Sequence, residues 1–359
     1  MKNYRFDDEF VTRIAAFLDS PEYGEQKEFS KSDYWKNHSE LFDLKIHDNN
    51  VSITGSSGFY VPNVNYLGKA IKSPKTALKR CFRWLANHWD ITHIKNHSVA
   101  FEQIMAFDAA DSSATSYADY FGAQSRYRLN PLMIARHKGA YESIGVIKAA
   151  VKKRYKLNFQ MVYSYYIFNI LNFFAGNDKN KTILEIGGGS GNLLSVMFDN
   201  FPGATLIDVD LPETLSSAIL FIKDLYPAAK ILMPNEIYGE SFQDYDFVFL
   251  TPAQTDNIKS NSLDIVTNLC SFQEMTKEQV TDYFDLIDRC AKDQGIFLTT
   301  NRAEKFSNSP GDGGLEKEPS RFADYPWRRA NKILAYEVCP LFYLTNPNCH
   351  FIRAEVVQK

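Results

Sequence analysis

The chain has 359 residues, of which 45% are hydrophobic and 23% are charged, and its formal net charge is −3 at pH 7. This composition is typical of a globular protein, and the length predicts either two domains or one large domain with a smaller one. The near-neutral balance of charge argues against a protein that grips nucleic acid by its phosphates, because such proteins present a basic face.

Two observations bear on where the protein is found. The first residues are charged and contain no apolar core of the signal-peptide kind. The longest apolar stretch, residues 161–175, is too short to span a bilayer and is interrupted by Ser164 and Asn169. We therefore expect a cytoplasmic protein.

Residues 1–125 predict a mainly helical region, which is a candidate cover for an acceptor site. Apolar side chains recur at helical spacing over residues 7–18 and stop at Ser20-Pro21. Residues 51–64 alternate, contain several glycines and predict a short hairpin or an irregular excursion. Further helices are expected at residues 75–89, 101–107 and 109–121, then from Asn130-Pro131, and over residues 158–174.

From residue 182 onward strands and helices alternate. Strands are expected at residues 182–184, 204–209, 246–250, 263–269 and 295–300, and helices at 192–200, 213–225 and 277–292. Thr276 and Gln279 form a capping box before the last helix. Residues 341–345 and 350–357 predict a closing antiparallel hairpin. We therefore expect an α/β fold with a Rossmann-like parallel sheet in a domain of residues 126–359, whose first part, 126–176, is a helical lead-in.

The segment with the clearest chemical meaning is residues 185–191, Glu-Ile-Gly-Gly-Gly-Ser-Gly, which follows the first strand of this region. A glycine-rich turn between a strand and a helix lets the backbone approach a ligand closely. The dinucleotide fingerprint would place its third glycine at position 192, which is Asn192. This register disfavours a nicotinamide oxidoreductase.

An acidic residue ends the second strand of the same unit. Asp210 precedes Leu211-Pro212, and a carboxylate at this place can accept hydrogen bonds from both hydroxyls of a ribose. Asp208 shares that face of the strand and is the alternative ribose partner, but the turn at Leu211-Pro212 favours Asp210.

With its acid-x-G-x-G-x-G motif, the chain resembles the class I S-adenosylmethionine-dependent methyltransferases. The Asp-Leu-Pro ending also looks like plant-type small-molecule O-methyltransferases, in which a histidine base stands where this chain has Gln273. Together with Ser-Phe-Gln-Glu-Met at residues 271–275, the motifs more closely resemble a bacterial family of sugar O-methyltransferases, over roughly residues 120–355. The resemblance implies a class I methyltransferase sheet with S-adenosylmethionine as cofactor, and a sugar hydroxyl as methyl acceptor.

The expected cofactor contacts come from the carboxyl ends of the first four strands. Glu185 would meet the amino group of the cofactor, directly or through water, and the amino end of the helix at Asn192 would face its carboxylate. The expected cofactor-binding residues are Glu185, Gly187, Gly188, Gly189, Gly191, Asp210, Leu211, Thr251 and Asn268.

Catalysis at a hydroxyl needs a base that removes its proton. Glu274, in the loop after the fourth strand, is the best local candidate, and His137 and His350 are the alternatives. Gln273 in the same loop is expected to contact the substrate. No metal site is assigned, since His93 and His97 lack an obvious carboxylate partner, but a divalent ion that positions a sugar diol stays open.

Residues 303–329 separate the fifth strand from the last elements and are rich in Gly, Pro, Ser and charge. A long loop at the active edge of a sheet is typical of a lid or a recognition loop. Tyr325 and Trp327 would then contact a sugar ring, although they also suit a role as anchors of the loop.

Three functions remain in competition. The first is an S-adenosylmethionine-dependent O-methyltransferase of a sugar or a sugar-bearing small molecule, with no nucleic-acid or membrane partner and with a homo-oligomer left open. The second is an O- or N-methyltransferase of a non-sugar secondary metabolite. The third is a cofactor-binding partner subunit without activity, which the missing histidine alone supports.

Overall fold

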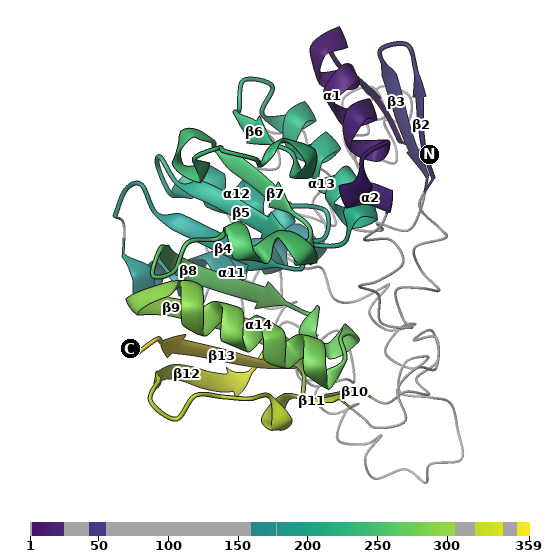
Figure 1. Cartoon of the computed structure of the whole chain (residues 1–359). Coiled ribbons are helices and arrows are strands. Elements are labelled where there is room, and N and C mark those ends of the chain that lie inside the picture. Colours follow the sequence, from purple (N-terminus) through teal and green to yellow (C-terminus); the bar gives the residue numbers. More distant parts are fainter. Residues whose placement is uncertain (1, 25–42, 55–158, 177, 306–319, 340–349) are drawn as a thin grey trace, which may run out of the picture. The chain divides into compact units, whose positions relative to one another are not determined.

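The computed structural model describes residues 2–24, 43–54, 159–176, 178–305, 320–339 and 350–359 (Figure 1). The chain divides into two compact units. One comprises Met1–Tyr60, Ile167–Cys339 and Asn348–Lys359, and the other comprises Val61–Tyr166 and Pro340–Pro347. The helices expected at 75–89, 101–107, 109–121 and from Asn130, together with the domain boundary at 125, lie outside the described residues.

An eight-stranded sheet forms the centre of the first unit, in the order β12-β13-β9-β8-β4-β5-β7-β6. The pairs from β6 to β9 are parallel, and β13 is antiparallel to both β9 and β12. The strands are β4 (Thr182–Ile186), β5 (Thr205–Val209), β6 (Ile231–Leu232), β7 (Phe247–Leu250), β8 (Leu263–Leu269), β9 (Ala291–Arg302), β12 (Lys332–Val338) and β13 (His350–Val356). The predicted parallel sheet with antiparallel strands at one edge is confirmed.

The closing pair differs from the prediction in its first arm. β13 has β9 on one side and β12 on the other, so the partner of His350–Val356 is Lys332–Val338 and not residues 341–345. Residues 341–345 themselves lie outside the described residues. Lys332–Val338 went unrecognised because it is exposed or half-buried on both faces at the sheet edge and so shows no strong alternation.

Four longer helices accompany the sheet: α11 (Phe159–Ala175), α12 (Asn192–Asn200), α13 (Pro212–Leu225) and α14 (Lys277–Cys290). α12 has the predicted bounds, and α14 begins at the predicted capping box, in which Thr276 Oγ1 accepts from the Gln279 amide. Short 3-10 helices lie in the connections: η1 (Pro234–Glu236), η2 (Phe242–Asp244), η3 (Pro252–Asn257), η4 (Phe272–Glu274) and η5 (Phe322–Asp324). In the described part of the chain, no helix combines the length and apolar character that crossing a membrane requires.

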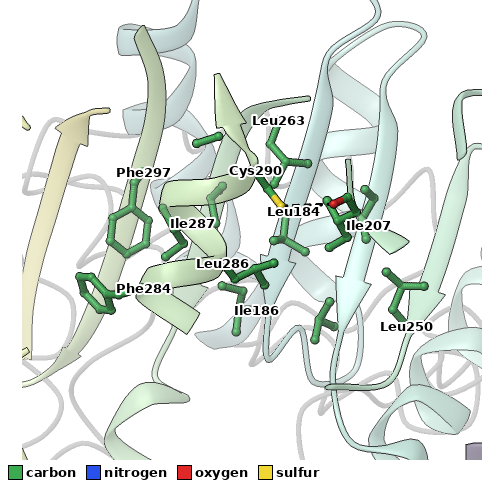
Figure 2. Packing of buried hydrophobic residues seen from close by; sticks show 14 of the residues in the cluster. Leu184, Ile186, Ile207, Leu250, Leu263, Phe284, Leu286, Ile287, Cys290 and Phe297 are labelled. Atoms are coloured by element: carbon green, nitrogen blue, oxygen red, sulfur yellow. Dashed lines mark hydrogen bonds between the residues drawn. The ribbon is translucent and has the colours of Figure 1, made fainter. Parts of the chain in front are cut away.

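The main core lies between α14 and one face of the sheet (Figure 2). Ile287 and Phe284 of α14 face the strands, where Leu184 and Phe297 are fully buried. The rings of Phe284 and Phe297 meet edge to face, with 5.6 Å between their centres. Each such buried side chain contributes about 1.5–3 kcal/mol through apolar burial, so this face fixes the positions of the strand ends.

The described amino-terminal elements form a small α/β module, and the mainly helical character expected for residues 1–125 stays a prediction because residues 25–42 and 55–125 lie outside the described residues. α1 (Asp8–Leu18) confirms the predicted helix, with the Asp7 side chain as its cap. β1 (Lys2–Arg5), β2 (Asp43–His47) and β3 (Asn50–Thr54) pair as an antiparallel sheet in the order β1-β3-β2, and α2 (Pro21–Gly24) follows α1. β3 overlaps the start of residues 51–64, where alternation predicted a short hairpin or an irregular excursion, and its partner β2 lies before that range.

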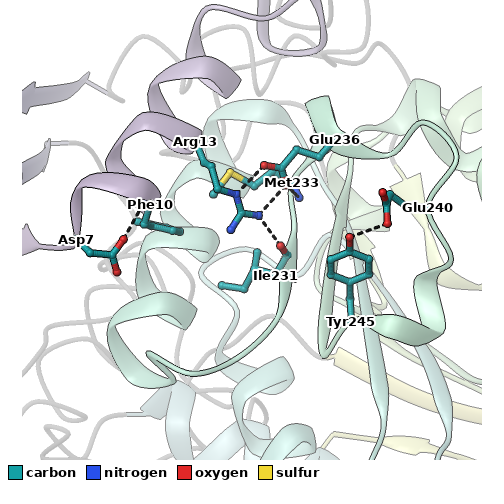
Figure 3. A network of polar contacts seen from close by, with 8 residues as sticks. All are labelled: Asp7, Phe10, Arg13, Ile231, Met233, Glu236, Glu240 and Tyr245. Carbon is teal, nitrogen blue, oxygen red and sulfur yellow. Dashed lines mark hydrogen bonds and ion pairs between the residues drawn. The ribbon is translucent and has the colours of Figure 1, made fainter.

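An arginine ties this module to the β6 edge of the large sheet (Figure 3). Arg13 donates from Nε and Nη2 to the two carboxylate oxygens of Glu236, each at 2.7 Å, and from Nη2 to the Ile231 carbonyl at 2.6 Å. Glu236 also accepts from the Met233 amide at 3.0 Å. This bidentate contact fixes both the distance and the orientation of Arg13 relative to Glu236, so it holds α1 against η1 and β6.

Candidate functional site

The residues that the sequence nominates converge on one edge of the large sheet. The parallel strands all end at this edge, and β13 begins there because it runs the opposite way and pairs His350 with Arg302. Backbone bonds join neighbouring strand ends, from the Gly187 amide to the Val209 carbonyl at 2.8 Å and from the Asp210 amide to the Leu250 carbonyl at 3.2 Å. Ligands of open parallel sheets bind at this edge.

The glycine loop connects β4 to α12 through a tight turn. The Gly191 amide donates to the Gly188 carbonyl at 3.0 Å, and Gly191 precedes α12 with a φ of 74°. A Cβ on Gly191 would meet Ile222 of α13 at 3.4 Å. The Gly189 amide donates to Asp210 Oδ2 at 2.8 Å, which binds the loop to the end of β5.

The glycines do not all serve a ligand, as the motif alone had suggested. A Cβ on Gly187 would collide with the Ser271 side chain, and a Cβ on Gly188 would lie 2.5 Å from Asp208 Oδ1. Gly189 alone combines a positive φ of 61° with open space, since no atom lies within 4 Å of the Cβ position. The loop therefore offers its close approach to a ligand at Gly189, while Gly187 and Gly188 are required by neighbouring side chains.

Three carboxyl groups lie around this loop. Glu185 and Asp208 are only 2% and 0% exposed and occupy paired positions on β4 and β5, so they share a face of the sheet. Burial, and then the charge of Asp210, raise the pKa of Glu185 to about 8. Desolvation raises the pKa of Asp210 to about 6, although the amides of Gly189 and Leu211 act in the opposite direction. Glu185 is therefore mostly neutral at pH 7.

The positions of the two aspartates distinguish the ribose candidates. Asp210 is partly exposed at the end of β5, and its two oxygens accept from the amides of Gly189 and Leu211 at 2.8 and 2.7 Å. Asp208 is fully buried behind Gly188, whose amide it accepts at 3.2 Å. Each carboxylate oxygen of Asp210 has a second lone pair, so Asp210 is the acid available to hydroxyl groups at the surface of the site.

Leu211 and Thr251 hold their places by local hydrogen bonds. Leu211 caps α13 and reaches Asp210 through its backbone amide. Thr251 is fully buried after β7, and its amide and hydroxyl both donate to Gln254 Oε1. These hydrogen bonds fix the backbone of Leu211 and Thr251 at the ends of β5 and β7. Direct contact of either residue with the cofactor stays a prediction.

A buried polar network supports the loop after β8. Asn268 donates from Nδ2 to the Ile186 carbonyl and to Ser271 Oγ, and its Oδ1 accepts from Thr299 and Asn301. The Asn268 side chain is therefore committed to the protein, and it positions the loop in place of the direct cofactor contact expected. Thr299 and Asn301 were missed, although their spacing of two puts both on one face of β9.

Gln273 is likewise engaged within the protein. It is 7% exposed, and its Oε1 accepts from the Arg302 amide at 2.7 Å while its own amide donates to Asn301 Oδ1 at 3.1 Å. These bonds join η4 to the end of β9. Contact of Gln273 with a substrate, which the sequence suggested, has no support in this arrangement.

The candidate bases differ in their position and in their exposure. Glu274 ends η4 and is partly exposed at the ligand edge of the sheet. His350 lies at the same edge but is only 2% exposed at the start of β13. His137 lies outside the described residues. Of the two described candidates, Glu274 is thus the more accessible to an acceptor.

Tyr325 is buried in the core and Trp327 is partly buried against it, while their contact with a substrate stays a prediction. Tyr325 packs against Phe272 of η4 with ring centres 5.8 Å apart. Trp327 lies 5.2 Å from the ring of Phe284, and Arg353 covers its face at 4.0 Å. These contacts with η4 and α14 favour the anchoring role that the sequence left open.

The ends of the expected lid are held by pairing. β10 (Glu304–Lys305) and β11 (Ser320–Arg321) form an antiparallel pair, in which Arg321 Nε donates to Glu304 Oε1 at 2.8 Å. Residues 306–319 between them lie outside the described residues, so the lid stays a prediction. Within the described ranges, no group of three or more His, Cys, Asp and Glu side chains is placed to hold a metal ion.

A parallel sheet closed at one edge by two antiparallel strands, with a glycine loop after β4 and an acid after β5, defines the architecture. This is the architecture that the resemblance to the class I methyltransferases led us to expect. No family model matches the sequence, and no curated protein matches it.

Part of this chain is similar to solved methyltransferase structures. The methyltransferase bound to the Haloferax volcanii Trm112 activator is 13% identical, with a TM-score of 0.35, and the match covers 51% of this chain and 85% of that one. Geranyl diphosphate C-methyltransferase from Streptomyces coelicolor A3(2), in complex with Mg²⁺, geranyl diphosphate and S-adenosyl-L-homocysteine, is 12% identical, with a TM-score of 0.38 and coverage of 54% and 80%. A SAM-dependent methyltransferase from Aquifex aeolicus is 12% identical, with a TM-score of 0.34 and coverage of 53% and 89%.

Proposed function

We propose that the chain is an S-adenosylmethionine-dependent methyltransferase. The observation that carries the proposal is the joint placement of Glu185, Gly189 and Asp210 at one edge of the sheet, with open space at Gly189. The glycine provides close approach to the backbone, and the acids suit an ammonium group and a ribose. Asn192 stands where a dinucleotide fingerprint needs glycine, which favours this cofactor over NAD.

The described residues fit the cofactor in charge and shape. Glu185 Oε2 is buried with no hydrogen-bond partner in the described residues, so a cationic amino group would satisfy it. Asp210 would accept from the ribose hydroxyls, and the first amides of α12 would receive the cofactor carboxylate. When bound, the cofactor supplies a methyl group on a positively charged sulfur.

The remaining task of the protein is to hold the acceptor and remove its proton. We assign proton removal to Glu274, because η4 places it at the ligand edge and the network around Asn268 fixes the loop that carries it. A carboxylate held in this way can accept the proton of a hydroxyl as the new bond to carbon forms. His350 is the alternative base.

For the acceptor we propose a hydroxyl of a sugar or a sugar-bearing small molecule. The support is the resemblance of residues 271–275 to the bacterial sugar O-methyltransferases. Tyr325 and Trp327 do not add to this support, since their contacts with η4 and α14 favour the anchoring role.

The cofactor claim is tested by calorimetry with S-adenosylhomocysteine and, separately, with NAD. We expect binding of the first and none of the second, and the reverse result refutes the proposal. Asp210→Asn should weaken the binding of S-adenosylhomocysteine about tenfold by loss of charge-assisted hydrogen bonds. Asp285→Asn on the exposed face of α14 is the matched control and should bind normally.

The acceptor claim is tested by a screen of nucleotide-sugars and glycosylated metabolites with cofactor labelled in the methyl group. Label in a sugar product that disappears with Glu274→Gln, while cofactor affinity is kept, supports both the acceptor and the base. Label only in non-sugar metabolites would support the alternative substrate class. Binding of cofactor without transfer to any compound would favour a partner subunit.

A further inference from the structure

Asp208, which the sequence left as the alternative ribose partner, is too deeply buried to offer its carboxyl group to a ribose at the surface of the site. Its side chain is fully buried in β5, and Oδ1 accepts from the Gly188 amide at 3.2 Å. A Cβ on Gly188 would lie 2.5 Å from Oδ1, 2.8 Å from Cγ and 2.9 Å from Oδ2. The carboxyl group of Asp208 thus occupies the space that a side chain at position 188 would fill.

The surroundings of Asp208 oppose a negative charge. Glu185 occupies the paired position on β4, and Asp210 follows two residues later on the same strand face. Oδ2 is buried without a hydrogen-bond partner in the described part of the chain. Burial first, then the charges of Asp210 and Glu185, raise the pKa of Asp208 well above its ordinary value. A neutral carboxylic acid avoids the cost of a third buried charge at this place.

We propose that Asp208 is a positioning residue, whose carboxyl group holds Gly188 and so sets the glycine loop in the form that receives the cofactor. The proposal rests on the proposed function. The link to the ligand is short, because Gly189 follows Gly188 directly and is the loop residue that faces open space. Asp208 would act without touching the cofactor, whereas Asp210 would touch it.

The contact between Asp208 and Gly188 can be tested as a pair. Gly188 has no positive φ, so the backbone conformation suits alanine, and the three atoms nearest to the new Cβ all belong to the carboxyl group of Asp208. Gly188→Ala should displace the loop, and Asp208→Ala should release it, each lowering affinity for S-adenosylhomocysteine about tenfold. Independent effects would multiply to about a hundredfold in the double variant. We expect instead a loss of about tenfold or less, because the new methyl group fills the space that the carboxyl leaves.

Asp208→Asn separates positioning from ligand contact. Asparagine keeps the shape of the neutral acid and can accept from the Gly188 amide, so affinity should stay within about threefold of the native protein. Asp210→Asn, in contrast, should lose about tenfold. A loss with Asp208→Asn as large as that with Asp210→Asn would make Asp208 a ligand contact and overturn the proposal, as would multiplicative losses in the pair.

The test also separates failure of this proposal from failure of the proposed function. If the native protein binds no S-adenosylhomocysteine, the proposed function fails, and with it the cofactor part of this proposal. Urea unfolding of the native protein, the two single variants and the double variant still measures the Asp208–Gly188 coupling. If the double variant lowers the urea midpoint by less than the sum of the two single variants, the steric contact between Asp208 and Gly188 is supported. If the losses add, the contact is refuted. Asp208→Asn should keep the affinity for S-adenosylhomocysteine and Asp208→Ala should not, even when the two variants are equally stable. A merely structural role of Asp208 would not produce this difference.

Discussion

The buried carboxyl of Glu185 predicts that cofactor binding releases a proton. The side chain is 2% exposed, and burial together with the charge of Asp210 raises its pKa to about 8. In the ligand-free protein at pH 6.5 it is therefore neutral. An ammonium group is bound well only by the carboxylate, so the proton must leave when the cofactor arrives.

The size of the effect follows from titration. Below the pKa of about 8, the ionised fraction of Glu185 falls tenfold for each pH unit, and the apparent association constant should fall by up to about tenfold per unit with it. The α-amino group of the cofactor itself titrates near ~8. Affinity should therefore rise from pH 6 to 7.5, reach a maximum near pH 8 and decline above it.

Calorimetry with S-adenosylhomocysteine measures this directly. Titrations at pH 6.5 in two buffers with different heats of ionisation give the number of protons released, which we expect to be about one. Glu185→Gln removes the titrating group while keeping the shape of the side chain, so the release should vanish and the rise toward pH 8 should flatten. A native affinity that is independent of pH, with no proton exchange, would refute the reasoning.

The same group affects the stability of the ligand-free protein. Because its pKa is raised in the folded state, the folded protein holds more protons than the unfolded chain between pH 4.5 and about 8. The free energy of unfolding should be highest below this window and fall as pH rises through it, by up to about 1.4 kcal/mol per pH unit. Urea unfolding at pH 5 to 8 should show this fall in the native protein and a smaller one in Glu185→Gln.

Three further variants test other parts of the structure. Gly189→Ala should cost about 1–2 kcal/mol of stability because of its φ of 61°, and it should also abolish cofactor binding. Gly239→Ala, at an equally open position with a φ of 80°, should lower stability and leave cofactor binding unchanged. Urea unfolding measures the first effect and calorimetry the second. Arg13→Gln should lower the free energy of unfolding by about 1–2 kcal/mol, since the pair with Glu236 is partly exposed, and an unchanged urea midpoint would contradict the proposed clamp. Trp327→Ala should cost about 3 kcal/mol with unchanged cofactor affinity, and a changed acceptor KM at normal stability would support its role in substrate binding.

The bounds of helices were predicted most accurately where the residues that start and end a helix lie close together in the sequence. Residues 192–200 were bounded by Gly191 and by Phe201-Pro-Gly, and α12 has these limits. The hydroxyl of Thr276 marked the start of α14. In contrast, the arm that pairs with β13 was placed too late in the chain, because an edge strand exposed on both faces has no strong alternation to reveal it.

In the candidate site, too, local motifs were recognised from the sequence and contacts between strands were not. Glu185, Asp210 and the glycine loop were identified because their spacing carries chemical meaning by itself. The side chains that support Asn268 from β9 were not, since Thr299 and Asn301 become its neighbours only when β8 and β9 pair. Gln273 has the right composition for a ligand contact, yet its amide oxygen is used to bind Arg302.

The sequence by itself determined the parallel sheet, the position of the ligand edge and the kind of cofactor we propose. These follow from local periodicity and from short motifs, in which every residue needed lies within one strand–turn–helix unit. Only the tertiary structure decided why each glycine is present, which aspartate is accessible, and that Tyr325 belongs to the core. Burial and contact between strands depend on residues far apart in the chain, and composition cannot report them.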